Sequence, residues 1–333
     1  MRKSLWSTAS EGFGRLLYLI PPHPEVAQIE VTNRCNFNCA MCQRIPLKVP
    51  IKDMELTLYK KVIDKLGPIK EVTLTGWGEP LMHSKIAEMI GYAKKKGKSV
   101  SLTSNGSLLT EKLALKLIDS GLDSISFSID EIKTPKSGSL VHPIMTQIKK
   151  VENFIKMTEG RRSKPEIIIQ VTLHQGREKE ILEVVEWASK IGADLVNLNR
   201  LDLRFNKKLK RPNLKEEREL VKKLDEWGEK YKIQTEFRPH LAFSGISRKI
   251  YRVLVPLMHQ RGKHCLRVYN YLYVNLEGKV TPCCALPLWV VGDLLKEDLE
   301  DIWKSEKFEN FRKHDFQRKI CGECDVLEIR QYS

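Results

Sequence analysis

The chain has 333 residues, of which 41% are hydrophobic and 30% are charged, as in an ordinary globular protein of one large domain or two. Its net charge of +15 is compatible with a nucleic acid, an anionic membrane surface or an acidic substrate, and charge alone identifies none of them. The apolar run at 16–20 ends at Pro21, so it is too short for a signal-peptide core or a membrane span. We therefore expect no membrane span and a cytoplasmic location.

Strands and helices alternate along residues 25–240. Short apolar, β-branched runs predict strands at 27–32, 71–75, 99–103, 124–129, 167–171 and 194–198. Between them, apolar residues at three- and four-residue spacing predict helices at 56–66, 84–96, 110–120, 141–159 and 177–190. This α/β alternation implies a parallel sheet with right-handed crossovers, and six units favour a partial (β/α)6, TIM-like barrel over a closed barrel of eight. Ligands of such sheets bind at the C-terminal ends of the strands.

The pattern changes in the last third of the chain. A helix at 214–230 and a strand at 233–237 are expected to extend the barrel edge, and an amphipathic helix at 247–259 follows. Residues 271–276 and 279–282 then predict a β-hairpin, with a helix at 299–313 after it. The sequence thus predicts an N-terminal arm (1–24), the barrel (25–240), a connecting helix (241–263) and a small C-terminal α+β domain (264–333).

Eight cysteines in a chain without an export signal indicate metal or redox chemistry rather than disulfides. Three of them, Cys35, Cys39 and Cys42, lie directly after the first predicted strand. Thiolates are the usual ligands of iron–sulfur clusters, and three of them leave one iron of a four-iron cluster open to another ligand. A zinc knuckle without its fourth ligand, or buried free cysteines, is the alternative.

The C-x3-C-x2-C spacing of these cysteines resembles that of the radical S-adenosylmethionine (SAM) superfamily, and the resemblance covers residues 25–240. It implies that Cys35, Cys39 and Cys42 hold a [4Fe-4S] cluster whose open iron binds SAM. It further implies reductive cleavage of SAM to a 5′-deoxyadenosyl radical that abstracts hydrogen from a substrate. A reducing electron donor such as flavodoxin or ferredoxin would then be a partner. Met41 stands where the family usually has an aromatic residue, and we expect it against the adenine.

A glycine turn ends the second predicted strand. Gly76, Trp77, Gly78 and Glu79 resemble the family's Gly-Gly-Glu motif, with Trp77 in place of the second glycine. The resemblance implies that carbonyls of this turn and the Glu79 carboxylate hold the amino group of SAM. Glycines at such a turn also let backbone groups approach a ligand closely.

Polar residues follow the next strands at the same sheet edge. Alternation places 124, 126, 128 and 130 on one face of the fourth strand and 125, 127 and 129 on the other. The family uses this strand to contact the SAM carboxylate and ribose, which selects Ser128 and Asp130. Further candidates for contact with SAM or substrate are Ser104, Asn105, Gln170, Thr172, Asn197, Asn199 and Arg200. Those on the last two strands are equally compatible with ordinary polar or ion-pairing roles, and His83 and His174 are not expected to be ligands.

Five cysteines lie in the last 69 residues: Cys265, Cys283, Cys284, Cys321 and Cys324. The hairpin brings Cys265 near Cys283, and four thiolates converging there would suit zinc or a second [4Fe-4S] cluster. The stretch from Asn275 to Arg312 resembles the SPASM/twitch extension of radical SAM enzymes, which implies one auxiliary [4Fe-4S] cluster. The implied ligands are Cys265, Cys321, Cys324 and either Cys283 or Cys284, and the family's G-x4-C spacing selects Cys283.

These features predict a radical SAM enzyme that performs a net oxidation or a maturation, assisted by the auxiliary cluster, on a small molecule or a peptide. A base is needed where a proton leaves the substrate, and Asp202, Arg200 and Glu131 are candidates of equal standing. Alternatives are a peptide or protein maturase, for which residues 1–25 are too short to form a leader-binding module, and an RNA modifier that uses the basic segment 204–211. A non-enzymatic iron–sulfur or zinc protein is the third alternative.

Overall fold

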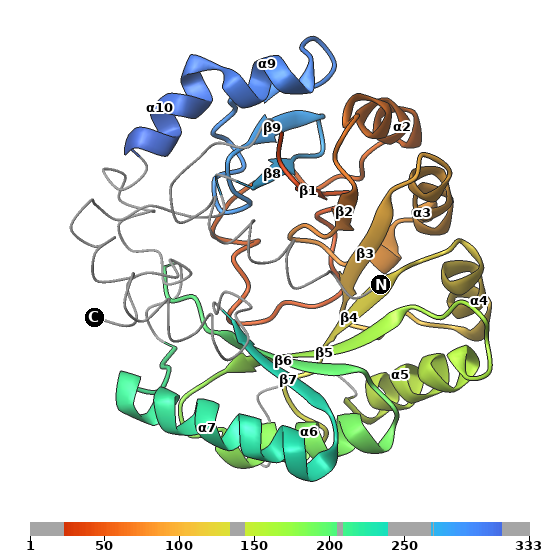
Figure 1. Ribbon diagram of the computed structural model, residues 1–333, viewed down its shortest axis with the longest axis vertical. Coiled ribbons are helices and arrows are strands. Elements are labelled where there is room, and N and C mark those ends of the chain that lie inside the picture. The colour runs from red at the N-terminus through yellow and green to blue at the C-terminus, as the bar shows by residue number, and fades with distance from the viewer. Residues whose placement is uncertain (1–22, 134–143, 205–208, 239–267, 269, 315–333) are drawn as a thin grey trace, which may run out of the picture.

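The computed structural model describes residues 23–133, 144–204, 209–238, 268 and 270–314. Within these residues one sheet runs in the order β10-β9-β8-β1-β2-β3-β4-β5-β6-β7 (Figure 1). Figure 1 shows the sheet curving so that helices α2 to α7 cover its outer side. No helix of this part of the chain is long and apolar enough to cross a bilayer.

Seven parallel strands form the barrel, and each predicted strand is present with its ends shifted by at most three residues. They are β1 (Val26–Ile29), β2 (Glu71–Leu74), β3 (Ser99–Ser104), β4 (Ser124–Ser128), β5 (Glu166–Leu173), β6 (Leu195–Arg200) and β7 (Gln234–Arg238). The helices are α2 (Leu56–Lys65), α3 (Ile86–Lys95), α4 (Glu111–Asp119), α5 (Ile144–Thr158), α6 (Glu178–Lys190) and α7 (Leu214–Tyr231). The predicted partial (β/α)6 barrel is confirmed, and β7 extends its edge as expected.

Side-chain capping fixes where several of these helices begin. The Thr110 hydroxyl accepts a hydrogen bond from the Leu113 amide at the start of α4. At α7, the Asn213 side chain accepts from the Glu216 amide, while the Glu216 carboxylate accepts from the Asn213 amide. This reciprocal pair satisfies backbone donors that the helix itself leaves unpaired.

The two faces of β4 differ as the alternation predicts. Ile125 and Phe127 are fully buried, and the Phe127 ring packs edge-on against Phe154 of α5 at 5.5 Å between centroids. On the opposite face Ser126 is half-buried and Ser128 is exposed. The apolar face therefore belongs to the core between the sheet and the helices, and the polar face is turned to the inside of the barrel.

The predicted C-terminal hairpin is confirmed as β8 (Tyr271–Val274) and β9 (Lys279–Thr281), which pair antiparallel. A short strand, β10 (Gly292–Asp293), pairs with β9. The sequence did not predict that β8 also pairs with β1, in parallel, so the hairpin continues the barrel sheet. The division into the domains 25–240 and 264–333 stays a prediction, and the helix predicted at 247–259 lies outside the described residues.

The single helix predicted at 299–313 is wrong, because two helices, α9 (Leu299–Lys304) and α10 (Glu306–His314), occupy this stretch. Ser305 between them has extended backbone angles, φ −59° and ψ 147°, and its hydroxyl accepts from the Phe308 amide to start α10. The break brings Arg312 onto Trp303, with the guanidinium 4.2 Å from the ring centroid. A favourable cation–π contact in the core thus accompanies the interruption.

Candidate cofactor site

The loop after β1 brings three thiols to one place. A turn closed by the Cys42 amide and the Cys39 carbonyl, 3.0 Å apart, holds these two residues together. Burial, and then the charges of Cys42 and Cys35, raise the pKa of the Cys39 thiol to about 11. Burial likewise raises the pKa of Cys35, where Cys42 contributes in the same direction. The three thiols therefore interact electrostatically, and none of them forms a disulfide.

The donor chemistry of this loop fits an iron–sulfur cluster. Backbone amides point at two of the sulfurs, from Phe37 to Cys35 Sγ at 3.4 Å and from Arg44 to Cys42 Sγ at 3.5 Å. Such N–H···S contacts adjust cluster potentials. Among the described residues no group of three His, Cys, Asp or Glu side chains is arranged for a single metal ion. A cubane cluster differs from one ion because each thiolate binds a separate iron, so its ligands stand further apart.

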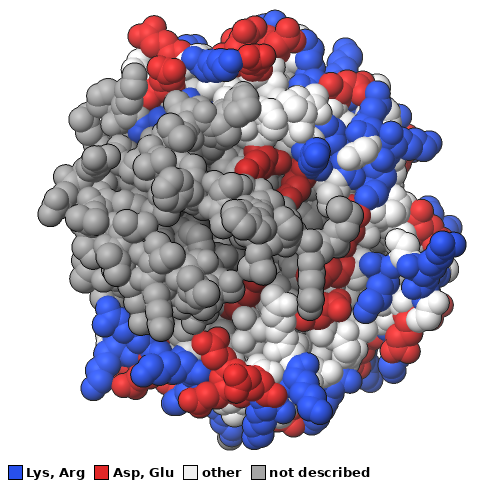
Figure 2. Space-filling view, in the orientation of Figure 1, with Lys and Arg blue, Asp and Glu red and all other residues white. Residues whose placement is uncertain are grey.

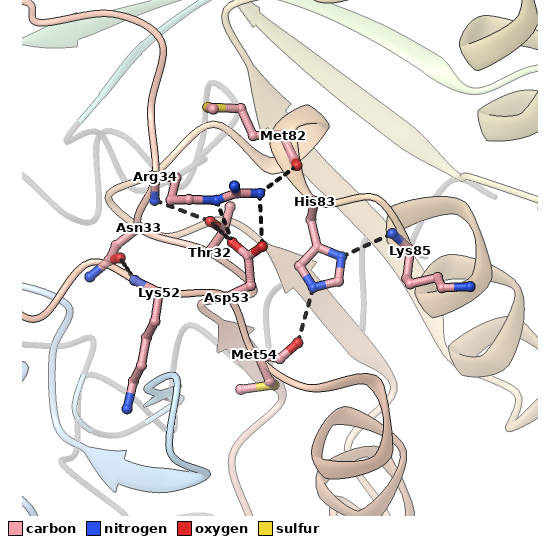
Figure 3. A network of polar contacts seen from close by, with 9 residues as sticks. All are labelled: Thr32, Asn33, Arg34, Lys52, Asp53, Met54, Met82, His83 and Lys85. Atoms are coloured by element: carbon pink, nitrogen blue, oxygen red, sulfur yellow. Dashed lines mark hydrogen bonds and ion pairs between the residues drawn. The ribbon is translucent and has the colours of Figure 1, made fainter.

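The residues before the cysteine loop are held by an ion pair (Figure 3). The Arg34 guanidinium donates to Asp53 Oδ1 at 2.9 Å, to Asp53 Oδ2 at 2.8 Å and to the Met82 carbonyl at 3.0 Å. The Thr32 hydroxyl donates to the same carboxylate at 2.6 Å. This arrangement ties the start of the loop to its return segment and to the short 3-10 helix η1 (Pro80–Met82).

A second set of contacts, drawn in part in Figure 3, fixes the return segment. The Asn33 side chain donates to the Pro50 carbonyl at 2.6 Å and accepts from the Lys52 amide at 2.8 Å. His83 is buried, with Nε2 3.0 Å from the Met54 carbonyl and Nδ1 accepting from the Lys85 amide. Through these contacts His83 joins the return segment to the segment after η1.

The Gly76–Glu79 turn packs tightly against the segment that leads to the cysteines. A Cβ at Gly76 would lie 2.4 Å from Glu30 Cγ, and one at Gly78 would lie 2.4 Å from the Thr32 carbonyl oxygen. Neither position accepts a side chain, so the glycines are required by close approach. Between these glycines, the Trp77 indole N–H donates to the Cys284 carbonyl at 2.9 Å.

Glu79 joins the end of β2 to the end of β3. Its carboxylate is 2% exposed and accepts three hydrogen bonds, from the Leu81 amide at 3.0 Å, the Ser104 hydroxyl at 2.8 Å and the Asn105 amide at 2.6 Å. Burial still raises the pKa of this carboxyl. The direct contact of Glu79 with the SAM amino group stays a prediction, since all three donors here come from the protein.

The polar residues predicted at the ends of β3 and β4 lie at the same edge as the thiols. The Asn105 side chain donates to Asn36 of the cysteine loop at 3.1 Å. Asp130 accepts from the Thr172 amide at 2.6 Å, and its charge also acts on the Cys39 thiol. Burial raises the pKa of Asp130. Asn105 and Asp130 are thus brought near the cysteine loop, while Ser104 donates to Glu79 and Ser128 ends β4. Contact of these four residues with SAM stays a prediction.

Several buried polar atoms at these strand ends have no hydrogen-bond partner among the described residues. They include Gln43 Oε1, Arg44 Nε and Glu131 Oε1, together with Asn197 Oδ1 and Asn199 Nδ2. Leaving a buried donor or acceptor unpaired costs free energy, and native proteins do so rarely. A polar ligand such as SAM would supply partners, so this edge of the barrel fits a polar cofactor. Met41 is half-buried in the same loop.

The three candidate bases are all held by charged partners. Arg200 is buried in an ion pair with Glu217 at 2.6 Å, and Glu131 pairs with Arg177 at 2.6 Å. Although burial opposes it, the hydrogen bonds and charge of Arg204 hold the pKa of Asp202 below its usual range. Because all three side chains are paired in this way, the pairs do not distinguish them, and Asp202, Arg200 and Glu131 all stay candidates.

Sequence reasoning missed two contributors to this edge. Gln43 follows the third cysteine and donates to Asp202, beyond β6, at 2.5 Å. Glu30 accepts from the Trp77 amide at 3.0 Å and is 2% exposed. No motif marks Gln43, because its partner lies 159 positions away. Glu30 could have been found, since it alternates with Gln28 on the polar face of β1.

The second cysteine group is described in part. Cys283 and Cys284 follow β9 and are half-buried, and the Cys283 carbonyl accepts from the Leu286 amide at 3.0 Å. The Cys284 thiol lies close enough to Tyr273 to contribute to the raised pKa of that phenol, after burial and Glu30. Cys265, Cys321 and Cys324 lie outside the described residues, so the auxiliary ligand set stays a prediction.

Comparison with known proteins identifies the family of the chain. The radical SAM superfamily model matches residues 29–201, and the model of an iron–sulfur cluster-binding domain matches residues 265–325. The chain therefore belongs to the radical SAM superfamily. It is an enzyme whose cofactors are SAM and a [4Fe-4S] cluster, and its C-terminal domain implies auxiliary iron–sulfur chemistry. A non-enzymatic iron–sulfur or zinc protein is thereby excluded.

Its relatives have different substrates. The chain is 27% identical over 179 residues to a tungsten-containing aldehyde ferredoxin oxidoreductase cofactor-modifying protein of Pyrococcus furiosus, covering 52% of this chain and 50% of that protein. The chain thus spans about half the length of that relative. It is 24% identical to the AdoMet-dependent heme synthase of Methanosarcina barkeri, over 92% of this chain and 89% of the synthase. It is also 24% identical to the PqqA peptide cyclase of Streptomyces rochei, over 89% of this chain and 80% of the cyclase.

Solved structures share the fold. Streptococcus suis SuiB bound to its precursor peptide SuiA has a TM-score of 0.71 at 15% identity, covering 99% of this chain and 76% of SuiB. Native anSMEcpe with bound AdoMet and a Cp18Cys peptide has a TM-score of 0.64 at 16% identity, covering 92% of this chain and 88% of anSMEcpe. Identities this low support the fold alone.

Proposed function

We propose that this enzyme cleaves SAM at a [4Fe-4S] cluster held by Cys35, Cys39 and Cys42 and removes a hydrogen atom from a substrate bound inside the barrel. The observation that carries the proposal is the meeting of three interacting, half-buried thiols with the Gly76–Glu79 turn at one edge of a parallel sheet. When bound, the cluster supplies the electron that breaks a sulfur–carbon bond of SAM. The chain's own residues position SAM and exclude water from it.

The unpaired polar atoms favour particular positions for SAM. Carbonyls of the Gly76–Glu79 turn would accept from its amino group, and Met41 would pack against the adenine. Ser104, Asn105, Ser128, Asp130 and Asn199 would serve its carboxylate and ribose, since they lie at the ends of β3, β4 and β6. Asn199 Nδ2 is a buried donor without a hydrogen-bond partner among the described residues, so it would donate to SAM without losing an existing hydrogen bond.

The reaction that follows is a net oxidation or a maturation of a small molecule or a peptide. The C-terminal domain favours it, because an auxiliary cluster next to the barrel would accept an electron from the substrate or bind the substrate directly. Cys283, with Cys265, Cys321 and Cys324, would hold one such cluster, and Cys284 would be left over. The names of the relatives, a cofactor-modifying protein, a heme synthase and a peptide cyclase, are in keeping with modification of a precursor.

Modification of RNA has less support. On the face shown in Figure 2, basic and acidic side chains are interleaved. Many basic residues of the described helices are ion-paired, such as Lys60 with Glu88 and Lys96 with Asp64. Nucleic-acid binding instead draws on a continuous basic surface and weakens steeply with salt. Of the basic segment 204–211, residues 205–208 lie outside the described part of the chain.

Anaerobic reconstitution with iron and sulfide, followed by dithionite and SAM, tests the proposal. We expect iron for two four-iron clusters per chain and formation of 5′-deoxyadenosine. Replacement of Cys35, Cys39 and Cys42 by alanine should abolish cleavage, whereas Cys321→Ala should leave uncoupled cleavage. Cys284→Ala is the matched control for Cys283→Ala and should retain both clusters. Absence of 5′-deoxyadenosine from a fully loaded wild-type enzyme would overturn the proposal.

A further inference from the structure

Trp77 connects two parts of the molecule that lie far apart in the sequence. Its backbone amide donates to the Glu30 carboxylate at 3.0 Å, which fixes the turn that would hold SAM. Its indole N–H donates to the Cys284 carbonyl at 2.9 Å, across 207 positions. In the motif that the turn resembles, this position is a glycine, which has no side chain to form such a contact. The connection therefore depends on the Trp77 side chain.

The surroundings of Trp77 are tightly packed. Glu30 is 2% exposed, and the phenol of Tyr273 is fully buried beside it. The charges of Glu30 and Cys284 both act on that phenol. Glu30, Trp77, Tyr273 and Cys284 thus form one group, named the Trp77 cluster below. It draws on β1, the turn after β2, β8 and the loop after β9.

The Trp77 cluster restricts movement of the Gly76–Glu79 turn relative to residues 283–284. The turn cannot move toward β1, because Gly76 already lies so close to Glu30 that a Cβ would clash with it. On the other side, Cys284 follows directly after Cys283, whose carbonyl accepts from the Leu286 amide and the Thr281 hydroxyl. Packed interiors transmit small displacements because they have few voids to absorb them. A shift of the turn would therefore reach residues 283–284.

We propose that Trp77 is a positioning residue that couples the SAM site to the auxiliary cluster, through its indole hydrogen bond to Cys284. The inference rests on the proposed function, since it takes the turn as part of the SAM site and Cys283 as an auxiliary ligand. Coupling between two binding sites is reciprocal. SAM therefore changes the reduction potential of the auxiliary cluster, and the redox state of that cluster changes the affinity for SAM by the same factor.

The test measures the midpoint potential of the auxiliary cluster with and without SAM, by anaerobic spectroscopic titration of the fully loaded enzyme. In the wild type we expect SAM to shift this midpoint potential. The shift should correspond to a roughly two- to tenfold change in SAM affinity, which is the effect of one hydrogen bond. For a one-electron couple this is roughly 20 to 60 mV. Trp77→Phe keeps an aromatic ring but removes the N–H, and its auxiliary cluster should no longer respond to SAM.

Trp187→Phe is the matched control, because the Trp187 indole also donates at 2.9 Å, to Glu152, away from the cysteines. It should keep the wild-type response. If Trp77→Phe fails to retain the auxiliary cluster, Trp77→Leu, which also lacks the indole N–H, replaces it, and loss of the SAM response is again expected. A full response in Trp77→Phe, or in Trp77→Leu where that variant replaces it, contradicts the coupling, as does a loaded wild type that cleaves SAM without any shift. Failure of the wild type to cleave SAM at all is a different result and contradicts the proposed function instead.

Discussion

The two faces of the barrel strands have different tasks, and β4 shows the difference within five residues. One face inserts Ile125 and Phe127 into the apolar layer beneath the helices, where both are fully buried. The other carries Ser124, Ser126 and Ser128, which are half-buried or exposed toward the inside of the barrel. The apolar face contributes to stability, and the proposed contacts with SAM lie on the polar face, so substitutions on the two faces should affect different measurements.

The largest effect on stability is expected from Phe127→Ala on the outer face. The change removes a fully buried ring that packs on Phe154, which should lower the free energy of unfolding by about 3 to 5 kcal/mol. Urea unfolding of the metal-free chain measures the loss. Ser126→Ala, one position away on the inner face, is the control and should change stability by less than about 1 kcal/mol. Equal losses of unfolding free energy in the two variants would contradict the difference between the two faces.

Glu79→Gln should affect both stability and SAM binding, because Glu79 is buried and lies in the turn that is proposed to hold SAM. The amide would turn an N–H toward a backbone amide that now donates to the carboxylate, so one buried hydrogen bond is lost. We expect a loss of about 1 to 3 kcal/mol in stability, accompanied by weaker SAM binding. Unfolding curves and anaerobic equilibrium dialysis with SAM measure the two effects. Glu88→Gln, an exposed acid paired with Lys60, should change neither; unaltered SAM affinity in Glu79→Gln would show that the turn does not depend on this carboxylate.

A smaller effect is expected from Asp53→Asn, which weakens the anchor of the cysteine loop. The Arg34–Asp53 pair is partly exposed, so its contribution to global stability is at most about 1 kcal/mol. The loop itself should open more often, and iron should pass to a chelator several-fold faster. The control is Asp64→Asn, because Asp64 forms an exposed pair of 2.6 Å with Lys96 outside this loop. Identical rates of iron loss in the two variants would show that the Arg34–Asp53 pair does not help to retain iron.

The smallest effect concerns Glu277, in the turn of the hairpin. Hydrogen bonds from Lys52 and Lys279 lower the pKa of this carboxyl to about 2, below the value of 4.5 taken for the unfolded chain. Its stabilisation is therefore present above pH 4.5 and is lost as the pH falls through 2. The side chain is 46% exposed, so solvent screening limits the contribution to below about 0.5 kcal/mol.

Glu277→Gln and the wild type should accordingly differ slightly in unfolding free energy at pH 6 and converge near pH 2. Added salt at pH 6 should narrow the gap, since exposed ion pairs are screened. A difference that grows as the pH falls would contradict the direction of the pKa shift.

The barrel could be predicted from the sequence, because the spacing of apolar residues and the positions where strands end can both be recognised in short stretches of sequence. The alternation on β4 and the grouping of Cys35, Cys39 and Cys42 with the Gly76–Glu79 turn follow from such windows. Ser305 was missed because one extended residue inside an amphipathic stretch leaves the pattern almost unchanged. The contacts of Trp77 with Cys284 and of Gln43 with Asp202 depend on tertiary packing, which no local window contains.

The pairing of β8 with β1 has a consequence for the synthesis of the chain. Glu25 and Asn270, which are hydrogen-bonded beside this pair, are 245 positions apart. At ribosomal rates of about 5 to 20 residues per second, β1 waits roughly 12 to 50 s for the strand that covers its edge. An uncovered strand edge invites pairing with other chains. During this interval the edge of β1, which leads to the first three cysteines, is open on the side that β8 later covers.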